Sequence, residues 1–493
     1  MIHVPMLERK MYGRLLEWKS RKHKCLVVRG QRQVGKTFII DAFARAEYEH
    51  YLYLNFNDSP ELKTIFEGDI SAEALVNKLS LYFGADSVVE GSTLVFLDEI
   101  QECGSAYSSL KQFTLYGKID VIASGSLLGL SSAPDDDRLI PLGYEESMLM
   151  RPLDFEEFLW SRKVPGSSIE EVRRCIRERV PMEPALYERM TRLFREYMVV
   201  GGMPEAVQSY AESGDLRQPD AVIEGILSTC MRDINRCNRG MDRIKTMDCF
   251  ESIPHQLSES NRKFMFSRIS NDGSRASSDR YRENLLWIRE AGYGNFCFAL
   301  TQPTLPLAGQ VKRDSFKIYM SDTGMLLHMY GDKAKAAAFE GDLSYNMGAV
   351  AENIVADGLV KCGYEPMYYR KDKGEGRMEL DFVEEFWDGV AAIEVKSGRS
   401  RIAPSISKVS DFYYIARRIV LEHGNIRVDE HGIEHYPLFA SAFVDEMDRR
   451  PRTDGAVVPS GNRRCSRSPP PPSRSSALDR PSPTAFFPRP AAS

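Results

Sequence analysis

The sequence predicts an α/β protein with several domains, and three local patterns lead to this prediction. An apolar run at residues 25–28 leads into a glycine-containing loop and then into a helical pattern of apolar residues. A continuous apolar run at 93–98 is typical of a buried parallel strand. The stretch ELDFVEEFWDGVAAIEVKSG (379–398) holds two strand-like runs around an Asp-Gly pair, which is the pattern of a β-hairpin.

The composition is that of a globular protein. The 493 residues are 43% apolar and 27% charged, enough for two to four domains. No apolar run approaches the ~18 residues that a membrane span needs, and the first residues are charged, unlike a signal peptide. The nine cysteines are scattered and form no CxxC pair. We therefore expect a reduced, cytoplasmic protein with no membrane partner.

The charge is unevenly distributed along the chain. Residues 449–493 hold nine Arg and two Asp, a net charge of +7. Because the whole chain has a net charge of −5, residues 1–448 have a net charge of −12. An acidic body argues against a broad nucleic-acid-binding surface, although a local groove stays open. The Pro-, Ser- and Arg-rich segment 446–493 is predicted to be a disordered tail. A tail that grips nucleic acid is the less favoured alternative.

The clearest functional motif is a phosphate-binding loop of the form G-x-x-x-x-G-K-T. Its glycines allow a tight turn whose N–H groups converge on phosphate oxygens, and the following helix adds its dipole. Lys36 places a charge on the β and γ phosphates, and the Thr37 hydroxyl holds Mg²⁺. The strand–loop–helix context is the one that the motif requires. The residues expected to surround ATP are Gly30, Gln33, Val34, Gly35, Lys36 and Thr37.

Two acidic residues follow the buried strand in TLVFLDEIQ (93–101). Asp98 would support Mg²⁺ through water, and Glu99 would polarise the attacking water. Taken alone, the pair would be interpreted as a strand that ends in a helix-capping Asp. Beside the phosphate loop, two adjacent acids with different roles favour an NTPase that hydrolyses its nucleotide.

A third strand is predicted in IDVIASGS (119–126). It ends in a Ser-Gly-Ser sequence whose hydroxyls could contact the γ-phosphate. A helix N-cap explains the same residues equally well, so both interpretations stay open.

The hairpin at 379–398 brings charged residues together in either of two registers. If its Asp-Gly pair forms the loop, Asp381 lies opposite Lys396; if the loop begins one residue earlier, Asp381 lies opposite Glu394. In both registers the three side chains share one face. Two carboxylates beside a lysine form a compact Mg²⁺ site in which Lys396 could activate water or stabilise phosphate charge. Cross-strand ion pairing on a solvated face is the alternative.

The middle of the chain is predicted to be mostly helical. Residues 153–240 alternate charged and apolar positions at helical spacing, as in a lid of packed helices. Residues 241–330 suggest the order helix, helix, strand, which suits a winged helix. Arginines in this segment could face a duplex, although interleaved glutamates favour a solvated helix face. They are Arg275, Arg280, Arg282 and Arg289.

Several motifs resemble, in the same order, bacterial and archaeal AAA-type P-loop ATPases with a C-terminal domain of unknown function, DUF4143. These motifs are GQRQVGKT, LVFLDEIQ, ASGSLLGL, MRPLDFEEFLW (150–160) and VVGGMPEAV (199–207). The resemblance covers roughly residues 8–440. It implies an AAA-like P-loop core, a helical lid, a winged-helix-like segment and a restriction-endonuclease-like α/β domain.

The C-terminal part also resembles the PD-(D/E)xK nucleases. Residues 348–364 suggest an amphipathic helix with Glu352 near its start, and in those nucleases a helix glutamate joins the hairpin acids. The matching pattern here is Glu352, Asp381 and Glu394-x-Lys396. The resemblance therefore implies a metal site with Glu352, Asp381 and Glu394 as ligands.

The predicted domains and functions follow from these observations. The expected domain ranges are 1–152 (ATPase core), 153–240 (lid), 241–330 (winged-helix-like), 331–445 (nuclease-like) and 446–493 (tail). We expect ATP hydrolysis coupled to a domain that could cleave DNA or RNA with Mg²⁺. The alternative is an ATP-dependent switch that docks a protein partner, or a second copy, through an inactive nuclease-like domain. Expected catalytic residues are Glu99, Glu394 and Lys396; expected metal ligands are Thr37, Asp98, Glu352, Asp381 and Glu394.

Overall fold

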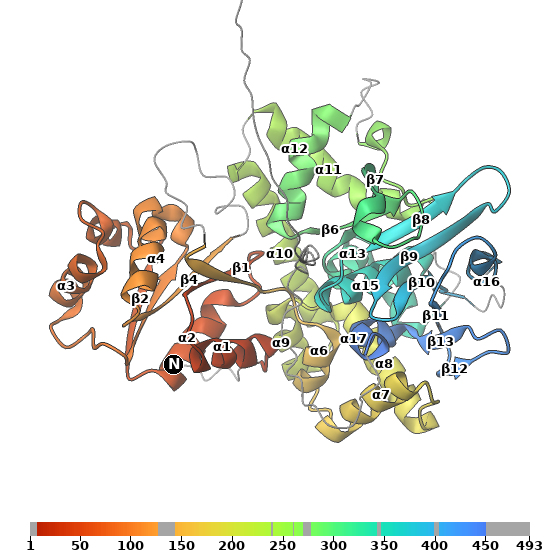
Figure 1. Cartoon of the computed structure of the whole chain (residues 1–493), viewed down its shortest axis with the longest axis horizontal. Coiled ribbons are helices and arrows are strands. Elements are labelled where there is room, and N and C mark those ends of the chain that lie inside the picture. Colours follow the sequence, from red (N-terminus) through yellow and green to blue (C-terminus); the bar gives the residue numbers. More distant parts are fainter. Residues whose placement is uncertain are drawn as a thin grey trace, which may run out of the picture. The chain divides into compact units, whose positions relative to one another are not determined.

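A computed structural model describes residues 7–126, 143–237, 240–259, 261–269, 278–342, 347–398 and 404–449. The predicted tail therefore lies outside the described residues from position 450 onward, and so does Arg275. The chain up to Arg449 forms one unit. Its described strands form two separate sheets, one from the N-terminal part and one from the C-terminal part (Figure 1).

The N-terminal sheet has five strands in the order β2-β3-β4-β1-β5, and every neighbouring pair is parallel. An all-parallel sheet is covered on both faces, which explains the continuous buried runs of the central strands β1 and β3. This confirms the α/β prediction for this part of the chain. The strands are β1 Cys25–Gly30, β2 His50–Asn55, β3 Thr93–Asp98, β4 Asp120–Ser126 and β5 Glu145–Leu149.

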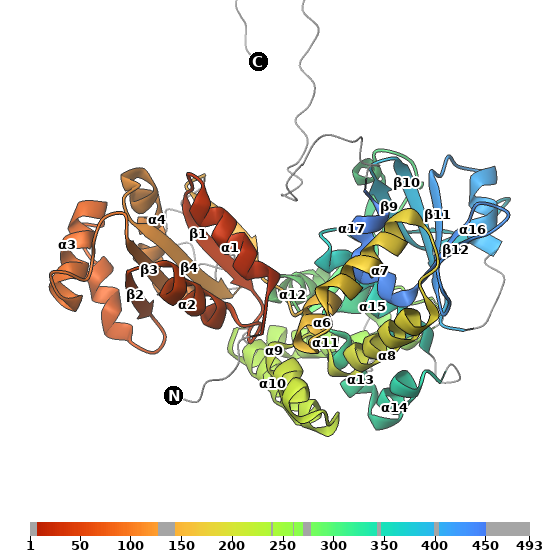
Figure 2. The same ribbon diagram turned by 90° about the horizontal axis from the view of Figure 1, so that it is seen from below.

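Helices cover both faces of this sheet (Figure 2). One face packs against α1 (Lys10–Ser20) and α2 (Lys36–Glu47), with which its alternate side chains share a core. The other face packs against α3 (Ala72–Phe83) and α4 (Gly104–Tyr116). Strand β1 lies between β4 and β5. The loop that follows β1 lies at the carboxyl edge of the sheet, where nucleotides bind in α/β folds.

Residues 155–237 are helical, as their apolar spacing predicts. The first helix begins with a capping box, in which Asp154 and Glu157 satisfy each other's backbone N–H groups. The helices are α6 Phe155–Ser161, α7 Gly166–Glu178, α8 Pro184–Val200, α9 Pro204–Ser213 and α10 Arg217–Cys237. None of the helices in the described ranges is long and apolar enough to cross a membrane.

The 199–207 motif holds this helical part against the C-terminal part. The backbone N–H of Gly202 donates to the Asp322 carboxylate at 2.6 Å, and Asp322 also caps α13 (Thr323–Tyr330). A Cβ on Gly202 would lie 2.1 Å from the carbonyl oxygen of Leu153, so only glycine allows this approach. The motif is therefore a packing element between α8, α13 and the segment before α6.

The C-terminal sheet has eight strands in the order β12-β13-β11-β10-β9-β8-β6-β7. The strands are β6 Gly294–Leu300, β7 Val311–Met320, β8 Met367–Lys371, β9 Met378–Phe386, β10 Gly389–Val395, β11 Arg417–Glu422, β12 Arg427–Val428 and β13 Glu434–Pro437. The associated helices are α11 Met241–Ser258, α12 Ser278–Ala291, α14 Asp332–Glu340, α15 Met347–Lys361, α16 Pro404–Lys408 and α17 Val444–Met447.

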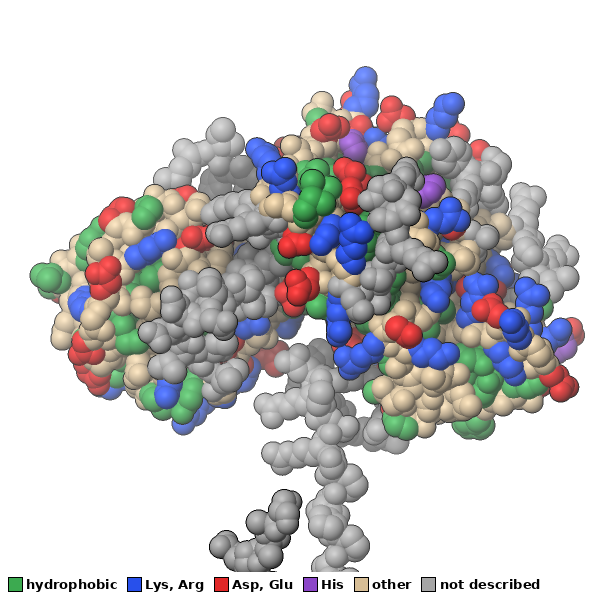
Figure 3. Space-filling view, turned by 90° about the horizontal axis from the view of Figure 1, so that it is seen from above, with side chains coloured by type: hydrophobic (Ala, Val, Ile, Leu, Met, Phe, Trp, Pro, Cys, Tyr) green, Lys and Arg blue, Asp and Glu red, His purple; other side chains and the backbone are tan. Residues whose placement is uncertain are grey.

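The segment predicted to resemble a winged helix contributes two strands to this sheet. Helices α11 and α12 precede β6, in the predicted order of helix, helix and strand. The β6–β7 hairpin is not a free-standing wing, because β6 pairs in parallel with β8. Arg289, one of the arginines considered for duplex contact, packs over the rings of Phe296 and Phe298 instead. On the face shown in Figure 3, basic and acidic side chains are intermixed.

The β9–β10 hairpin adopts the second of the two predicted registers. Phe386 pairs with Gly389, so the loop is Trp387–Asp388 and the pairing continues toward Asp381 opposite Glu394. On its other side β9 carries a β-bulge, because two residues along β8 match three residues along β9 between Leu380 and Val383. Strict alternation is therefore interrupted between Leu380 and Val383, the stretch that contains Asp381.

Candidate functional site

The phosphate loop joins β1 to α2 and has the backbone conformation that the motif requires. Gln33 and Gly35 have positive φ angles of 62° and 89°, in the left-handed region that turns the chain back toward the helix. A Cβ on Gly30 would lie 2.3 Å from the carbonyl oxygen of Met150. Gly30 is therefore required by packing against the segment after β5, in addition to its role in the turn.

Lys36 is buried at the start of α2. Its ammonium donates to the carbonyl oxygens of Gly30, at 3.0 Å, and Gln31, at 2.9 Å. Burial lowers the pKa of Lys36 to about 8, against the opposing effect of the carboxylates of Glu99 and Asp98. The lysine is thus held over its own loop by weak neutral acceptors, and it can exchange them for phosphate oxygens.

Asp98 is the most heavily hydrogen-bonded acid of the site. Its Oδ2 accepts from the Thr37 hydroxyl at 3.0 Å and from the Tyr53 hydroxyl at 2.9 Å. Its Oδ1 accepts from the Ser124 hydroxyl and from the backbone N–H of Glu99, the latter at 3.1 Å. Thr37 and Asp98 are hard oxygen donors in contact, which fits the Mg²⁺ expected between them. Ser124 therefore orients the Asp98 carboxylate. The alternative prediction, in which the Ser-Gly-Ser sequence caps a following helix, concerns residues 127–142, which lie outside the described residues.

Glu99 leaves the strand in a left-handed conformation, with φ 53° and ψ 46°. This backbone is uncommon for a residue with a side chain and is typical of functional sites. The Glu99 carboxylate accepts a hydrogen bond from the amide of Gln101. The strained turn places Glu99 immediately after the Asp98 cluster, at the carboxyl edge of the sheet where the phosphate loop also lies.

Arg9 supports the phosphate loop and was not predicted from the sequence. Its guanidinium donates to the carbonyl oxygen of Val34 at 3.1 Å, to that of Arg151 at 2.7 Å and to Glu157 Oε1 at 3.1 Å. Arg9 is buried, so these charge-assisted bonds are strong. The arginine ties the loop to α6, whose first turn contains Glu157. No local pattern could have revealed contacts that span up to 148 residues.

The second candidate site is an acidic cluster around Glu352, in α15. Glu352 is 3% exposed, and its Oε2 accepts from the Tyr319 hydroxyl at 2.9 Å. Its Oε1 accepts from a guanidinium nitrogen of Arg262. The Lys317 ammonium lies 3.6 Å from Oε2. The helix glutamate expected as a metal ligand is therefore already bound by two cations and a hydroxyl.

Lys317, in β7, is a buried cation that sequence reasoning missed. It is 1% exposed and lies 3.4 Å from Glu379 Oε1 as well as close to Glu352. Burial opposes its charge, but the carboxylates of Glu352, Asp381 and Glu379 raise its pKa overall. Its ammonium has no hydrogen-bond partner among the described residues. Lys317 therefore balances charge inside the cluster and keeps donors free for another group.

The hairpin acids lie next to these residues. The Glu394 Oε1 accepts from the Lys396 ammonium at 2.6 Å, while its Oε2 is buried with no partner in the described part of the chain. The Asp381 Oδ2 accepts from the backbone N–H of Val395 at 2.8 Å. Burial raises the pKa of both carboxyls, and the nearby Glu352 carboxylate raises it further. A lysine opposes the rise in each case, Lys317 for Asp381 and Lys396 for Glu394. Glu394 and Lys396 are in direct contact, and Asp381 is an electrostatic neighbour.

The cluster fits a metal ion only in part. Within the described ranges, no three or more His, Cys, Asp or Glu side chains are arranged to hold a metal ion. Two cations lie beside the Glu352 carboxylate, with Arg262 bonded to Oε1 and Lys317 3.6 Å from Oε2. The orphaned Glu394 Oε2 is nevertheless a hard acceptor that a divalent cation would satisfy.

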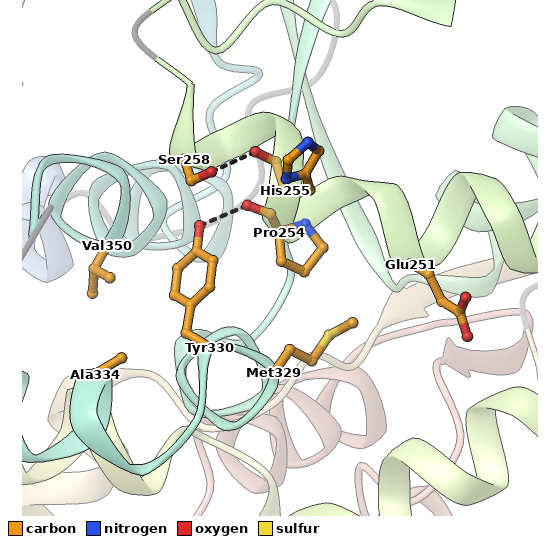
Figure 4. Close-up of a pocket in the computed structure, with 8 residues that line it drawn as sticks. All are labelled: Glu251, Pro254, His255, Ser258, Met329, Tyr330, Ala334 and Val350. Carbon is orange, nitrogen blue, oxygen red and sulfur yellow. Dashed lines mark hydrogen bonds between the residues drawn. The ribbon is translucent and has the colours of Figure 1, made fainter. Parts of the chain in front are cut away.

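A separate cavity of about 460 Å³ lies between α11, α13, α14 and α15 (Figure 4). The Tyr330 hydroxyl donates to the carbonyl oxygen of Pro254 at 2.8 Å. Pro254 stands inside α11, so Tyr330 ties α13 to the backbone of α11 at the cavity wall. Val350, two residues before Glu352 in α15, also lines the cavity.

Three family models match parts of the chain. Residues 22–159 match a model described as an AAA domain. Residues 191–336 and 347–439 match two models described as domains of unknown function, DUF8612 and DUF4143. No curated protein matched the chain. The first match spans β1 to β5 and, with the loop geometry, supports an AAA-type P-loop ATPase domain, as predicted; the nuclease-like fold of the DUF4143 part stays a prediction.

Several solved structures resemble the chain at low identity. The Walker-type ATPase PABY2304 of Pyrococcus abyssi is 13% identical, with a TM-score of 0.41 over 66% of this chain and 97% of that protein. The ORC2 protein of Aeropyrum pernix, in its ADPNP–ADP complexes, is 12% identical, with a TM-score of 0.33 over 68% and 92%. CDC6P from Pyrobaculum aerophilum is 12% identical, with a TM-score of 0.25 over 69% and 96%. These likenesses are too distant to assign an activity.

The lowered pKa of Lys36 predicts a pH dependence for nucleotide binding. Only the protonated lysine attracts phosphate, so the affinity of the free protein for ATP should fall as the pH rises through about 8. An unperturbed lysine would keep its charge to about pH 10.4. Titration with a fluorescent ATP analogue over a pH series measures this fall. An affinity that stays constant to pH 10 would contradict the assignment of Lys36.

Proposed function

We propose that this protein binds ATP with Mg²⁺ and hydrolyses it at the edge of the N-terminal sheet. The observation that carries the proposal is the 3.0 Å contact between Thr37 and the buried Asp98, next to Lys36 on a glycine-shaped loop. This arrangement combines a cation for the phosphates with two oxygen donors for the metal ion. The match to an AAA domain over residues 22–159 supports the same activity.

Each residue has a distinct role in the proposed reaction. Lys36 leaves the carbonyls of Gly30 and Gln31 and neutralises the β and γ phosphates. Thr37 and Asp98 would hold Mg²⁺, which would supply positive charge to neutralise the phosphates. Glu99, in a left-handed turn directly after Asp98, orients the attacking water and accepts its proton.

Two substitutions separate binding from hydrolysis. Lys36→Ala should abolish both ATP binding and turnover, because it removes the phosphate cation. Glu99→Gln should keep ATP binding within a few-fold of wild type and lower turnover by about 10²–10⁴, the usual contribution of a general base. Binding is measured with a fluorescent ATP analogue and turnover as released phosphate. Full turnover in either variant would refute the proposed site.

We further propose that the nucleotide state influences the acidic cluster of the C-terminal part. Strand β7 carries Lys317 and Tyr319 at the cluster, and Ser321, just after β7, donates to Gln31 of the phosphate loop at 3.3 Å. Helix α15 carries Glu352 at the cluster, and its last residue, Lys361, donates to the carbonyl oxygen of Leu153 at 3.0 Å. Strand β7 thus leads from the cluster to the phosphate loop, and α15 leads to the segment before α6, which supports coupling between the two candidate sites.

The proposed activity of the acidic cluster is Mg²⁺-dependent cleavage of DNA or RNA, with Asp381 and Glu394 as metal ligands and Lys396 beside the phosphate. The orphaned oxygen of Glu394 supports this proposal. The test is incubation with single- and double-stranded DNA and RNA and Mn²⁺ or Mg²⁺. Asp381→Asn should lower cleavage at least 100-fold, whereas Glu385→Gln, an exposed residue of the same strand, should not.

The alternative function is an ATP-dependent switch that docks a partner through a nuclease-like domain without activity. The two cations bound to Glu352 favour it, because they occupy the expected metal ligand. It predicts no cleavage by the wild type on any of the substrates. It also predicts ATP-dependent association with a partner or a second copy that survives Asp381→Asn.

A further inference from the structure

Arg32 is a charged residue of the phosphate loop, and it takes no part in the proposed hydrolysis. Its Nε lies 2.6 Å from the Asp233 Oδ2, in helix α10, and its side chain is 33% exposed. Asp233 is buried, at 8% exposure. The ion pair therefore joins the phosphate loop to a helix about 200 positions further along the chain.

The position of Arg32 gives it access to the nucleotide. It lies within the loop that would surround the phosphates, two residues after Gly30 and one before Gln33. It is also close enough to Lys36 to oppose the positive charge of that ammonium and contribute to its lowered pKa. Two like charges held close together at a phosphate loop favour an incoming polyanion. A guanidinium is also well suited to bidentate contact with phosphate oxygens.

Asp233 and the triphosphate would compete for the same guanidinium. In the present structure the aspartate has the arginine as its cation, and the Tyr293 hydroxyl lies 3.5 Å from the same oxygen. The backbone carbonyl of Tyr293 in turn accepts from the N–H of Ser321, the residue that contacts Gln31 of the loop. Any movement of Arg32 away from Asp233 thus alters the support of α10 and of the segment after β7.

We propose that Arg32 senses the nucleotide: its guanidinium exchanges Asp233 for an oxygen of the terminal phosphate of ATP, and this exchange loosens helix α10. The inference rests on the ATP site proposed above. ADP lacks the terminal phosphate and leaves the Arg32–Asp233 pair in place. Arg32 thereby distinguishes the two nucleotides and reports the difference to the helical part of the chain.

The test compares Arg32→Gln, Asp233→Asn and a control, Arg45→Gln, which removes a similar ion pair from the exposed end of α2. The readouts are the affinities for fluorescent ATP and ADP analogues, and backbone hydrogen exchange in residues 217–237. Arg32→Gln should weaken ATP binding by about 10- to 100-fold, as expected for a lost charged hydrogen bond, and leave ADP binding unchanged. In wild type, ATP but not ADP should accelerate exchange in α10.

The second variant decides the question even if Arg32→Gln fails to fold. Asp233→Asn removes the competing carboxylate, so this variant should bind ATP more tightly than wild type. Backbone hydrogen exchange in α10 should then be equally fast with ATP and with ADP. Wild-type affinity for both nucleotides in Arg32→Gln, or ATP-specific exchange that persists in Asp233→Asn, would overturn the sensor while leaving the ATP site intact. A wild type that binds no ATP, like Lys36→Ala, would overturn both proposals. Arg45→Gln should behave as wild type throughout.

Discussion

The buried carboxylate of Asp98 is the constraint on which the N-terminal part depends. A carboxyl group at 2% exposure is tolerated only with several hydrogen-bond partners, and four donors surround this one. They come from α2, β2, β4 and the turn after β3: Thr37, Tyr53, Ser124 and the N–H of Glu99. The acid thereby aligns the ends of three parallel strands with the phosphate loop, and the geometry of the nucleotide site follows from it.

The acidic cluster of the C-terminal part solves a similar problem differently. There the buried carboxylates meet cations, Lys317 and Arg262 on Glu352 and Lys396 on Glu394, in place of neutral donors. Cations stabilise such a cluster without a bound metal, but they also compete with one. The balance between these charges decides whether the cluster is a catalytic centre or a structural element. Strand β7 and helix α15 extend from it toward the phosphate loop, so either role could respond to nucleotide.

The sequence predicted the features that depend on local pattern. The parallel strands, the phosphate loop and the order of Asp98 and Glu99 follow from apolar runs and fixed spacings, and the family match to an AAA domain agrees with them. Arg9, Asp233 and Lys317 could not be found this way, because their contacts join residues far apart in the chain. The bulge at Asp381 was also unforeseen, because a strand pattern assumes strict alternation.

The most direct test of the central claim is the Mg²⁺-dependent ATP turnover of Asp98→Asn, measured beside its thermal unfolding. Asparagine keeps the size of the side chain and can still accept from Thr37, but it loses the charge that the metal ion needs. We expect a protein that unfolds cooperatively, as wild type does, yet has lost at least about 100-fold in turnover. Turnover equal to that of wild type would contradict the assignment of Asp98 and Thr37 as the magnesium site.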